Sequence, residues 1–544
     1  MTGTQHSSTL IVNAHIYCPS VPFASALFIH QGHIAWVGDG SGAQVHEEIA
    51  DRVIDARGQF IAPAFVDAHV HATSTGLLLD GLDLTGVRHR KELLDLVSSY
   101  SRLKKGAPVI GHGWDQTEWT DPTLPSRTEI DRASWGSVVY LSRIDVHSAL
   151  ISSALLAQVP EAARIEGFGD HSVSAQAHQL LRAQALDHIT MDQRRNAQIA
   201  FGNHALARGI ASVHEMAGPA ISSADDARLL MELSRNGFGP EVYLYWGQLA
   251  SEGGLAMVQE LGAVGAGGDL FIDGAIGSRT AALHSAYSDA PDTSGVSYLT
   301  SEQVSDHVSA CSDANIQSGF HVIGDRGMSI ALDGITRSFD KGRFNKRLRH
   351  RLEHAELTTN EQIQAITQFG LTSSMQPLFD SLWGGPGGMY ANRLGERSHQ
   401  MNRWGSLLSQ GASVCFSSDA PVTDMDPWRA VHAAMFHNNV SERISARAAF
   451  SAHTRAGWRA LGAQFDGTGV IEVGSPAHLA MWDVENYSVQ VPDQRVSSWS
   501  TDPRSATAPL PDLGSAKNPS IPTCTMTLVG GQIRHALGDL EEYL

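Results

Sequence analysis

The sequence has few cysteines and no long hydrophobic run. Its four cysteines (Cys18, Cys311, Cys415 and Cys524) form no CxxC pair, which favours a reducing compartment and buried thiols over a disulfide framework. No apolar stretch approaches the ~20 residues of a membrane-spanning helix. Residues 1–10 lack the basic and apolar segments of a secretory signal. We therefore expect a cytoplasmic protein that does not bind a membrane.

Positive charge is also scarce. The chain has 39 Lys and Arg against 57 Asp and Glu, a formal net charge of −18 and a pI near 5.8. Nucleic acid would be repelled, so we expect a small molecule as the partner instead. Histidine, in contrast, occurs 26 times, which makes a metal site worth seeking.

With 544 residues the chain is too long for one ordinary core. Both ends carry short runs of β-branched and aromatic residues bounded by Gly, Asp or Asn, such as TLIVNAHIY near the start and TMTLVGGQIRHA near the finish. We predict a small β-sandwich domain assembled from residues 1–63 and 466–544.

Between these ends, strand-like runs alternate with helical stretches, which predicts an α/β fold with a parallel sheet. Eight such runs predict a closed (β/α)₈ TIM barrel over residues 64–465. The gap after the first run is far too long for one βα connection, so we expect an inserted lid or cap at about 76–205. The eight runs are FVDAHV (65–70), GIASVHEMA (209–217), EVYLYWGQL (241–249), DLFIDGA (269–275), QSGFHVIGD (317–325), HRLEHAE (350–356), LTSSMQPLF (371–379) and ASVCFSSDA (412–420).

Histidines and one aspartate follow four of these strands. His69 and His71 are two apart on the first strand and so face the same side. The spacing puts His321, His354 and Asp419 on the fifth, sixth and eighth strands. Because the carboxyl ends of barrel strands meet at one mouth, we predict that these five residues hold one divalent ion.

The sequence resembles the amidohydrolase superfamily almost from end to end, and specifically its amidohydrolase-3-type branch, which includes N-substituted formamide deformylase. IAPAFVDAHVH is similar to that family's HxH motif, with Ala64 in place of a glycine, and the further blocks occur in the expected order. These blocks are GWDQTEW, SRIDVHSALISSALL, LFIDGAIGSRTAAL, FHVIGDRG, RLEHAE, SSMQP, SSDAPVTDMDPW and GVIEVGSPAHLAMWD.

One further departure from the family pattern bears on the metal site. Many members of this branch have a carboxylated lysine that bridges two metals, whereas this chain has Asp269 there. We therefore predict one Zn²⁺ rather than two, with Mn²⁺ or Fe²⁺ also compatible with the ligands. A second, weaker site would use His354 with Asp269 or Glu215.

The metal would lower the pKa of its water towards ~7 and supply a metal-bound hydroxide. Asp419 would take the proton from that water and pass it to the leaving nitrogen, and His354 would help to polarise the carbonyl. Six further residues are predicted to contact substrate: Trp114, Asp115 and His147 in the insertion, Asp273 and Arg279 at the fourth strand and its loop, and Gln376 on the seventh strand. Arg279 suits a substrate carboxylate, although an ion pair with a neighbour explains it equally well.

The resemblance implies hydrolysis of a C–N bond in a linear amide, an N-acyl amine or an N-formyl amine. The alternatives are a deaminase or a cyclic-amide or carbamate hydrolase that uses the same site, and a non-catalytic regulatory or binding protein on the same fold. The resemblance also makes a homodimer possible.

Overall fold

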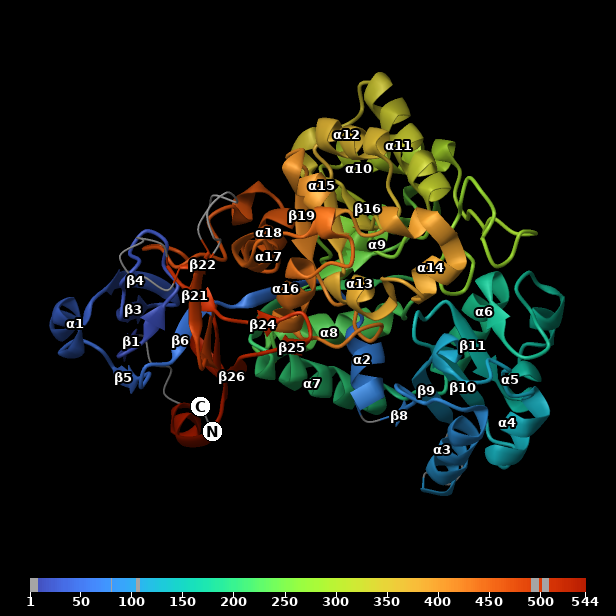
Figure 1. The fold of residues 1–544 in the computed structure, drawn as a ribbon, viewed down its shortest axis with the longest axis horizontal. Coiled ribbons are helices and arrows are strands. Elements are labelled where there is room, and N and C mark those ends of the chain that lie inside the picture. The colour runs from blue at the N-terminus through green and yellow to red at the C-terminus, as the bar shows by residue number, and fades with distance from the viewer. Residues whose placement is uncertain (1–7, 80, 104–107, 491–498, 501–507) are drawn as a thin grey trace.

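The computed structural model describes residues 8–79, 81–103, 108–490, 499–500 and 508–544. Residues 1–7, which carry most of the segment examined for a secretory signal, lie outside this part of the chain. Three regions are visible in Figure 1: a central barrel, an insertion rich in helices on one side of it, and a β-rich lobe built from both chain ends on the other.

The centre of the molecule is an eight-stranded parallel sheet. Each neighbouring pair is parallel. The first and last strands meet beyond their ends, where Asp419 N–H donates to His69 O and His71 N–H donates to Ala420 O, both at 2.9 Å. The predicted TIM barrel is thereby confirmed. In sheet order, the strands are β7 (Phe65–Val70), β13 (Ile210–Ala217), β14 (Glu241–Trp246), β15 (Gly265–Ala266), β16 (Gln317–Val322), β17 (Arg351–His354), β18 (Thr372–Met375) and β19 (Ser413–Phe416).

The fourth strand is a correction to the sequence prediction. It is β15, which lies before the expected run 269–275, and that run keeps only an isolated bridge between Phe271 and His321. Two glycines explain the shift. A Cβ at Gly267 would lie 2.2 Å from the Gly319 backbone nitrogen, and Gly268 has a φ of +84°. The chain leaves the sheet there, so Asp269 follows the strand instead of opening it.

Helices cover the outside of the barrel, as Figure 1 shows for the yellow and orange segments. Several begin with a capping box, for example Thr300 with Gln303 and Thr359 with Gln362, in which each side chain satisfies a free backbone N–H. These helices are α2 (Ala72–Leu79), α7 (Met191–Ala207), α8 (Ala224–Arg235), α9 (Gly254–Leu261), α10 (Ser301–Asp313), α11 (Asp325–Asp340), α12 (Asn360–Phe369), α13 (Pro377–Trp383), α14 (Met389–Leu394), α15 (Trp404–Ser409), α16 (Pro427–Met435), α17 (Ala446–Ala452) and α18 (Arg455–Ala460).

The insertion after the first barrel strand has its own sheet and its own apolar core. Helices α2 and α7 pack together and α7 also packs on β13, so both belong to the layer around the barrel. We therefore propose that the cap comprises β8 to α6 and is shorter than the predicted 76–205. Its elements are β8 (Leu82–Asp83), α3 (Arg90–Leu103), β9 (Val109–Trp114), α4 (Arg127–Ala133), β10 (Val139–Arg143), β11 (Ser148–Ile151), α5 (Ser153–Leu156), β12 (Val173–Ser174) and α6 (Ala175–Leu186).

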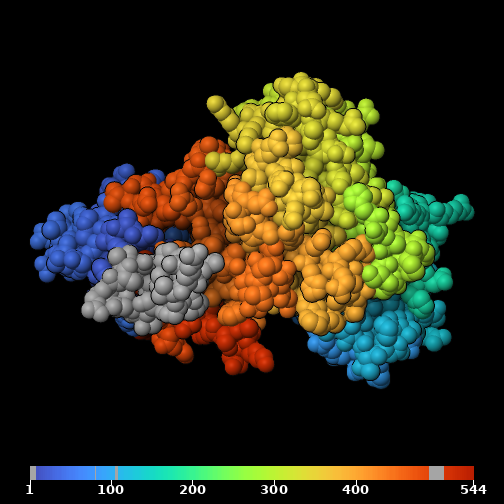
Figure 2. All heavy atoms as spheres, turned by 45° about the horizontal axis from the view of Figure 1, so that its top comes forward, coloured from blue at the N-terminus to red at the C-terminus, as the bar shows by residue number. Residues whose placement is uncertain are grey.

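The two chain ends share a β-rich lobe. One sheet has the order β4-β3-β1-β5, and the other, β2-β6-β20-β26-β27, combines strands from both termini. An apolar cluster that includes Ile11, Leu27 and Met526 draws on both sheets, and Figure 2 shows blue and red atoms together at this end. The lobe's elements are β1 (Ser8–Val12), β2 (His15–Ile16), β3 (Ala26–His30), β4 (His33–Gly38), α1 (Gly40–Glu47), β5 (Arg52–Asp55), β6 (Phe60–Pro63), β20 (Leu479–Asp483), β26 (Thr523–Val529) and β27 (Gln532–Ala536).

Shorter strands follow β20: β21 (Tyr487–Gln490), β22 (Trp499–Ser500), β23 (Leu510–Pro511), β24 (Gly514–Ser515) and β25 (Asn518–Pro519). The exact boundaries of the composite domain, 1–63 and 466–544, stay a prediction. Within the described part of the chain, no helix combines the length and apolar character needed to cross a bilayer.

Candidate metal centre and active site

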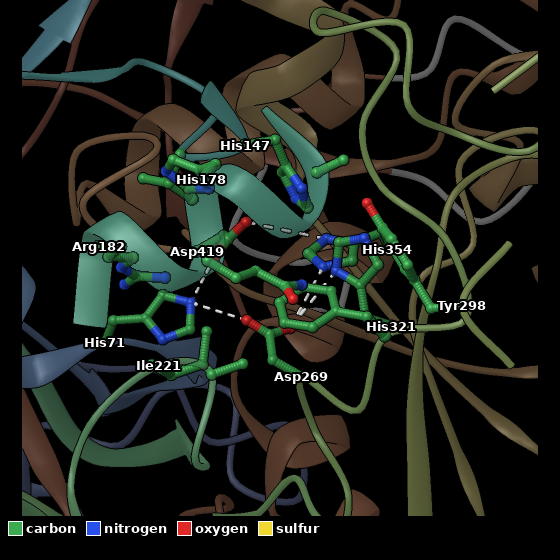
Figure 3. A pocket seen from close by; sticks show the side chains of 15 residues that line it. His71, His147, His178, Arg182, Ile221, Asp269, Tyr298, His321, His354 and Asp419 are labelled. Atoms are coloured by element: carbon green, nitrogen blue, oxygen red, sulfur yellow. Dashed lines mark ion pairs between the residues drawn. The ribbon is translucent and has the colours of Figure 1, made fainter. Parts of the chain in front are cut away.

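Four histidines and two aspartates meet at the carboxyl end of the barrel. Figure 3 shows His71, His321, His354, Asp269 and Asp419 pointing toward one another in a pocket. His69 belongs to the same cluster, because its Nε2 lies 3.5 Å from Asp269 Oδ1 and 3.4 Å from Asp419 Oδ1. All six residues are buried. The structure thus brings together the five residues predicted as ligands, and with them Asp269, which was predicted only for a second, weaker site.

Each imidazole is oriented by a hydrogen bond on the nitrogen that faces away from the cluster. His69 Nδ1 bonds to Glu353 Oε2 at 3.0 Å, and His71 Nδ1 bonds to the Met216 carbonyl at 3.1 Å. The other two rings follow the same pattern: His321 Nε2 lies 3.3 Å from Gly274 O, and His354 Nδ1 lies 3.0 Å from Gln376 Oε1. Because these acceptors hold a proton on the outer nitrogen, the inner nitrogen of each ring is the one that would bind an ion.

The Asp269 carboxylate lies among all four rings. Its oxygens are 3.3 Å from His71 Nε2, 3.5 Å from His321 Nδ1 and 3.9 Å from His354 Nε2. Asp is shorter than a carboxylated lysine, but the glycine pair before it carries the backbone close to the barrel mouth. The Asp269 carboxylate therefore reaches all four imidazole rings, although the shortness of this side chain led us to predict a single ion.

The cluster stabilises positive charge. Burial lowers the pKa of His71, but Asp269 and Asp419 outweigh burial and raise that pKa to about 10. The pKa of His354 rises to about 9 for the same reason, because the two carboxylates act against burial. For Asp269, burial raises the pKa, yet the surrounding histidines hold it well below its usual value. Two ionised carboxylates facing four imidazoles suit a divalent cation.

The polar atoms left without partners support the same conclusion. His69 Nε2, His321 Nδ1, Asp269 Oδ1 and Asp419 Oδ1 are buried, and among the described residues none has a hydrogen-bond partner. Buried polar atoms without partners are costly, and all four face this one centre. Three overlapping triads have ligand atoms close enough to hold an ion: His69–His71–Asp269, His69–His354–Asp419 and Asp269–His321–His354. The residues present fit a metal.

Two members of the cluster have strained backbone. His354 has a φ of +71° and Asp419 a φ of +55°, in the left-handed region that residues with a side chain rarely adopt. Such strain costs on the order of 1–3 kcal/mol per residue and is found most often at functional sites. Here it turns both side chains from the ends of β17 and β19 into the barrel mouth.

Glu353 and Arg351 support His69 and were not identified from the sequence. Arg351 Nε and Nη2 donate to Glu353 at 2.7 and 3.0 Å, and Arg351 Nη2 also donates to Ala68 O at 2.7 Å. Burial raises the pKa of Glu353, but Arg351 outweighs it and lowers that pKa to about 2. The alternation of charged residues in RLEH on a buried strand was the available signal for this inward-facing pair.

Of the six predicted substrate contacts, only His147 lines the pocket at the metal cluster. This pocket has a volume of about 490 Å³, and a second pocket of about 330 Å³ meets the cluster from another side. His147 lines both pockets, and its ring centroid lies 5.1 Å from that of His321. Its ring nitrogens form no hydrogen bond with any described residue, so they are available to a substrate.

Two of the other predicted contacts hold the cap together. Trp114 Nε1 donates to Leu141 O at 2.8 Å, and Asp115 forms a buried ion pair with Arg143. Arg143 also binds Asp145, which accepts a hydrogen bond at 2.8 Å from Ser278 in the loop after the fourth strand. These contacts connect the cap to the barrel.

The remaining predicted residues bind protein groups. Asp273 accepts backbone N–H groups from Ile323, Gly324 and Ala282 at 2.8 to 2.9 Å. The guanidinium of Arg279 bonds to Asp289 at 2.9 and 3.1 Å.

Gln376 orients His354, as described above. Glu215, predicted for a second metal, lies outside the three triads and accepts the Ala72 N–H at 2.7 Å. Substrate or metal binding by Asp273, Arg279, Gln376 and Glu215 stays a prediction, and the structure gives each of them a role within the protein.

A parallel barrel with histidines and carboxylates converging at the carboxyl ends of its strands is the architecture of a metal-dependent hydrolase. The model of the amidohydrolase family matches residues 52–535, so the chain belongs to that family.

The chain is similar to known proteins over most of its length. It is 28% identical to Protein LONG AFTER FAR-RED 3 of Arabidopsis thaliana, over 78% of this chain and 77% of that protein. It is 23% identical to N-substituted formamide deformylase of Arthrobacter pascens, over 88% and 94%. The crystal structure of an uncharacterized metal-dependent hydrolase from Pyrococcus furiosus superposes with a TM-score of 0.68 at 26% identity, covering 88% of this chain and 99% of that chain.

Proposed function

We propose that this hydrolase cleaves a C–N bond in a linear amide, an N-acyl amine or an N-formyl amine, and releases an acid and an amine. The observation that carries the proposal is the position of the metal cluster between two pockets. His147, His321, His354 and Asp419 line both of them. A linear substrate can place its two halves in separate pockets with the scissile bond at the cluster.

The roles of the residues follow from their positions. A bound divalent ion supplies Lewis acidity, which lowers the pKa of water and polarises a carbonyl. Asp419 accepts a proton from the attacking water and delivers it to the leaving nitrogen. His354, held by Gln376, faces the same space and would help to hold the ion that polarises the carbonyl.

We propose that the centre accommodates two ions that share Asp269. His69, His71 and Asp419 would hold one, and His321 and His354 the other, with Asp269 facing both groups at 3.3 to 3.9 Å. The expectation of a single Zn²⁺ depended on the short reach of Asp269, and the observed distances favour the two-ion arrangement. Imidazole and carboxylate ligands fit Zn²⁺ well and also suit Mn²⁺ or Fe²⁺.

The test of function is a panel of N-formyl and N-acyl amines, linear amides, cyclic amides and aminoheterocycles, assayed for amine and for ammonia. We expect amine release from the linear compounds. Ammonia from aminoheterocycles would replace the proposal with a deaminase, and ring opening would replace it with a cyclic-amide hydrolase. His69→Ala, His71→Ala and Asp419→Asn should each abolish turnover with little change in thermal stability beyond the loss of metal.

A non-catalytic regulatory or binding role is the remaining alternative. Metal analysis of the purified protein separates it from the enzyme: we expect at least one ion per chain and a lower melting temperature after chelation. Less than one ion per chain, together with a melting temperature unchanged by chelator, would favour the non-catalytic role.

A further inference from the structure

Arg182 is a buried cation with no hydrogen-bond or ion-pair partner among the described residues. It lies on helix α6 of the cap and is only 8% exposed. Across the described residues, no carboxylate oxygen lies within 4 Å of its guanidinium, and no described group forms a hydrogen bond with it. Other buried arginines are paired: Arg143 with Asp115 and Asp145, and Arg351 with Glu353.

The position of Arg182 explains why no residue in the described part of the chain pairs with it. It lines the pocket at the metal cluster and also an adjoining pocket of about 460 Å³. Figure 3 shows its side chain beside His71, with His178 on the same helix nearby. A buried charge without a partner is costly, and a guanidinium that opens onto a cavity can recover that cost by binding an anion from outside the protein.

Among the described residues, no neighbouring ionisable group forms an ion pair with Arg182, and Asp145 is already paired with Arg143. His178 Nε2 is hydrogen-bonded to Tyr140 OH at 2.8 Å, and His112 Nε2 lies 2.9 Å from Pro421 O. The two carboxylates of the pocket, Asp269 and Asp419, face the histidine cluster. A planar guanidinium with free N–H groups is the preferred partner of a carboxylate.

The adjoining pocket is mainly apolar. Its wall includes Leu77, Leu78, Leu82, Ile110 and Leu186, and it shares Arg182 and Val146 with the wall of the metal pocket. A molecule that extends from the metal cluster past Arg182 therefore meets a catalytic centre, then a cation, then an apolar cavity.

We propose that Arg182 binds a carboxylate of the substrate, and that the substrate is an N-acyl or N-formyl derivative of an amino acid with an apolar side chain. This inference rests on the proposed function. The carboxylate pairs with Arg182, the apolar side chain enters the adjoining pocket, and the amide carbonyl reaches the metal cluster. Arg182, and not Arg279, is then the residue that recognises the anion, because Asp289 already occupies the Arg279 guanidinium.

The experiment compares N-formyl-leucine with its neutral counterpart N-formyl-3-methylbutylamine, which lacks only the carboxylate. For the wild type, we expect kcat/KM to favour the anion by about 30-fold or more, the range for a desolvated charge pair. Arg182→Gln should abolish this preference while kcat/KM for the neutral compound changes less than about threefold. Arg182→Lys should restore part of it, because lysine keeps the charge without the planar fork.

A binding measurement keeps the inference separate from the proposed function. Calorimetry with the metal-loaded Asp419→Asn protein gives the dissociation constant of N-formyl-leucine without turnover. Arg182→Gln in that background should weaken binding of the anion about 30-fold or more and leave the neutral compound unaffected. If binding follows this pattern but the wild type hydrolyses neither compound, the proposed function fails and the anion site stands.

The matched control is Arg195→Gln, which removes the same charge from the exposed side of α7, where Arg195 faces Glu232 at 3.9 Å. It should leave the preference for the anion unchanged. The melting temperature of Arg182→Gln should match or exceed that of the wild type, because the substitution removes no partner of any residue that the structure describes. Equal weakening of both compounds, no preference in the wild type, or a melting temperature far below that of the wild type would overturn the inference.

Discussion

At the residue scale, the orientation of each ligand ring depends on an acceptor behind it. His69 depends on a carboxylate, Glu353, whereas His71 and His321 depend on backbone carbonyls. A side-chain acceptor can be altered without changing the backbone. Outer hydrogen bonds of this kind fix ring orientation and raise the basicity of the ligand nitrogen.

Glu353→Gln should therefore weaken metal binding by about 10- to 100-fold, the usual effect of removing such a partner. The amide still accepts from His69 but no longer neutralises Arg351, so we also expect a lower melting temperature. Competition with a chelator measures the affinity. Glu361→Gln, on the exposed surface of α12, is the control. An unchanged affinity in Glu353→Gln would show that Glu353 does not support the metal site.

The sequence was sufficient to predict His69, His71, His321, His354 and Asp419, because strand periodicity and βα spacing place them at one mouth. It predicted Asp269 only for a second, weaker site, because the reach of this side chain depends on where a glycine pair releases the chain from the sheet. Arg182 was also beyond sequence reasoning. A single arginine on a helix does not reveal whether a carboxylate faces it in the fold.

At the scale of elements, close packing of α2 on α7 sets the position of the chain that follows His71. Gly76 lies at the contact, and a Cβ there would be 1.8 Å from the Ala197 carbonyl oxygen. Gly76→Ala must separate the helices, which we expect to cost about 1–3 kcal/mol. Thermal unfolding measures this loss of stability. The control is Gly40→Ala on α1, where a Cβ meets nothing within 4 Å. Equal melting temperatures for Gly76→Ala and Gly40→Ala would contradict the close packing of α2 on α7.

A second prediction at this scale concerns the opposite end of the barrel, where His350 joins β16 to β17. His350 Nδ1 accepts the Ser318 N–H at 3.0 Å, so the ring must be neutral there. Burial, followed by the influence of His307, lowers the pKa of His350 to about 3 from an ordinary value of 6.5. Between these values the unfolded chain binds more protons, so stability is complete above about pH 6.5 and falls as the pH falls.

Two pH units in this window correspond to about 2–3 kcal/mol for this residue. His350→Asn keeps an acceptor near the Nδ1 position but does not titrate. We expect the free energy of unfolding to fall less steeply between pH 6.5 and 4.5 in the variant than in the wild type. Urea unfolding at a series of pH values measures both slopes. Identical slopes would mean that His350 accepts its proton in the folded state.

For whole elements, strand periodicity predicted seven of the eight barrel strands closely. The fourth was displaced because DLFIDGA has the composition of a strand, while Gly267 and Gly268 break the pairing just before it. The cap was predicted as a segment but not in its internal structure. Its sheet depends on contacts between segments far apart in the chain, which local patterns do not encode.

At the scale of the whole molecule, the two chain ends meet in one lobe and the cap borders the metal pocket, which His147, His178 and Arg182 help to line. Both features follow from the order of strand-rich and helix-rich segments, so the architecture was largely predictable. The cytoplasmic location and a homodimer stay predictions. The chain carries a formal net charge of −18 and as a whole does not attract anions. Binding of an anion therefore depends on local positive charge such as that of Arg182.

The most direct measurement is anomalous diffraction at the absorption edge of the bound metal, from crystals of the protein grown with a divalent ion. The account predicts scattering peaks enclosed by His69, His71, His321, His354 and Asp419, with Asp269 between two of them. One peak only would reduce the centre to the single ion first expected. No peak in this cluster, with the same side chains turned away from one another, would contradict the assignment as a metal-dependent hydrolase.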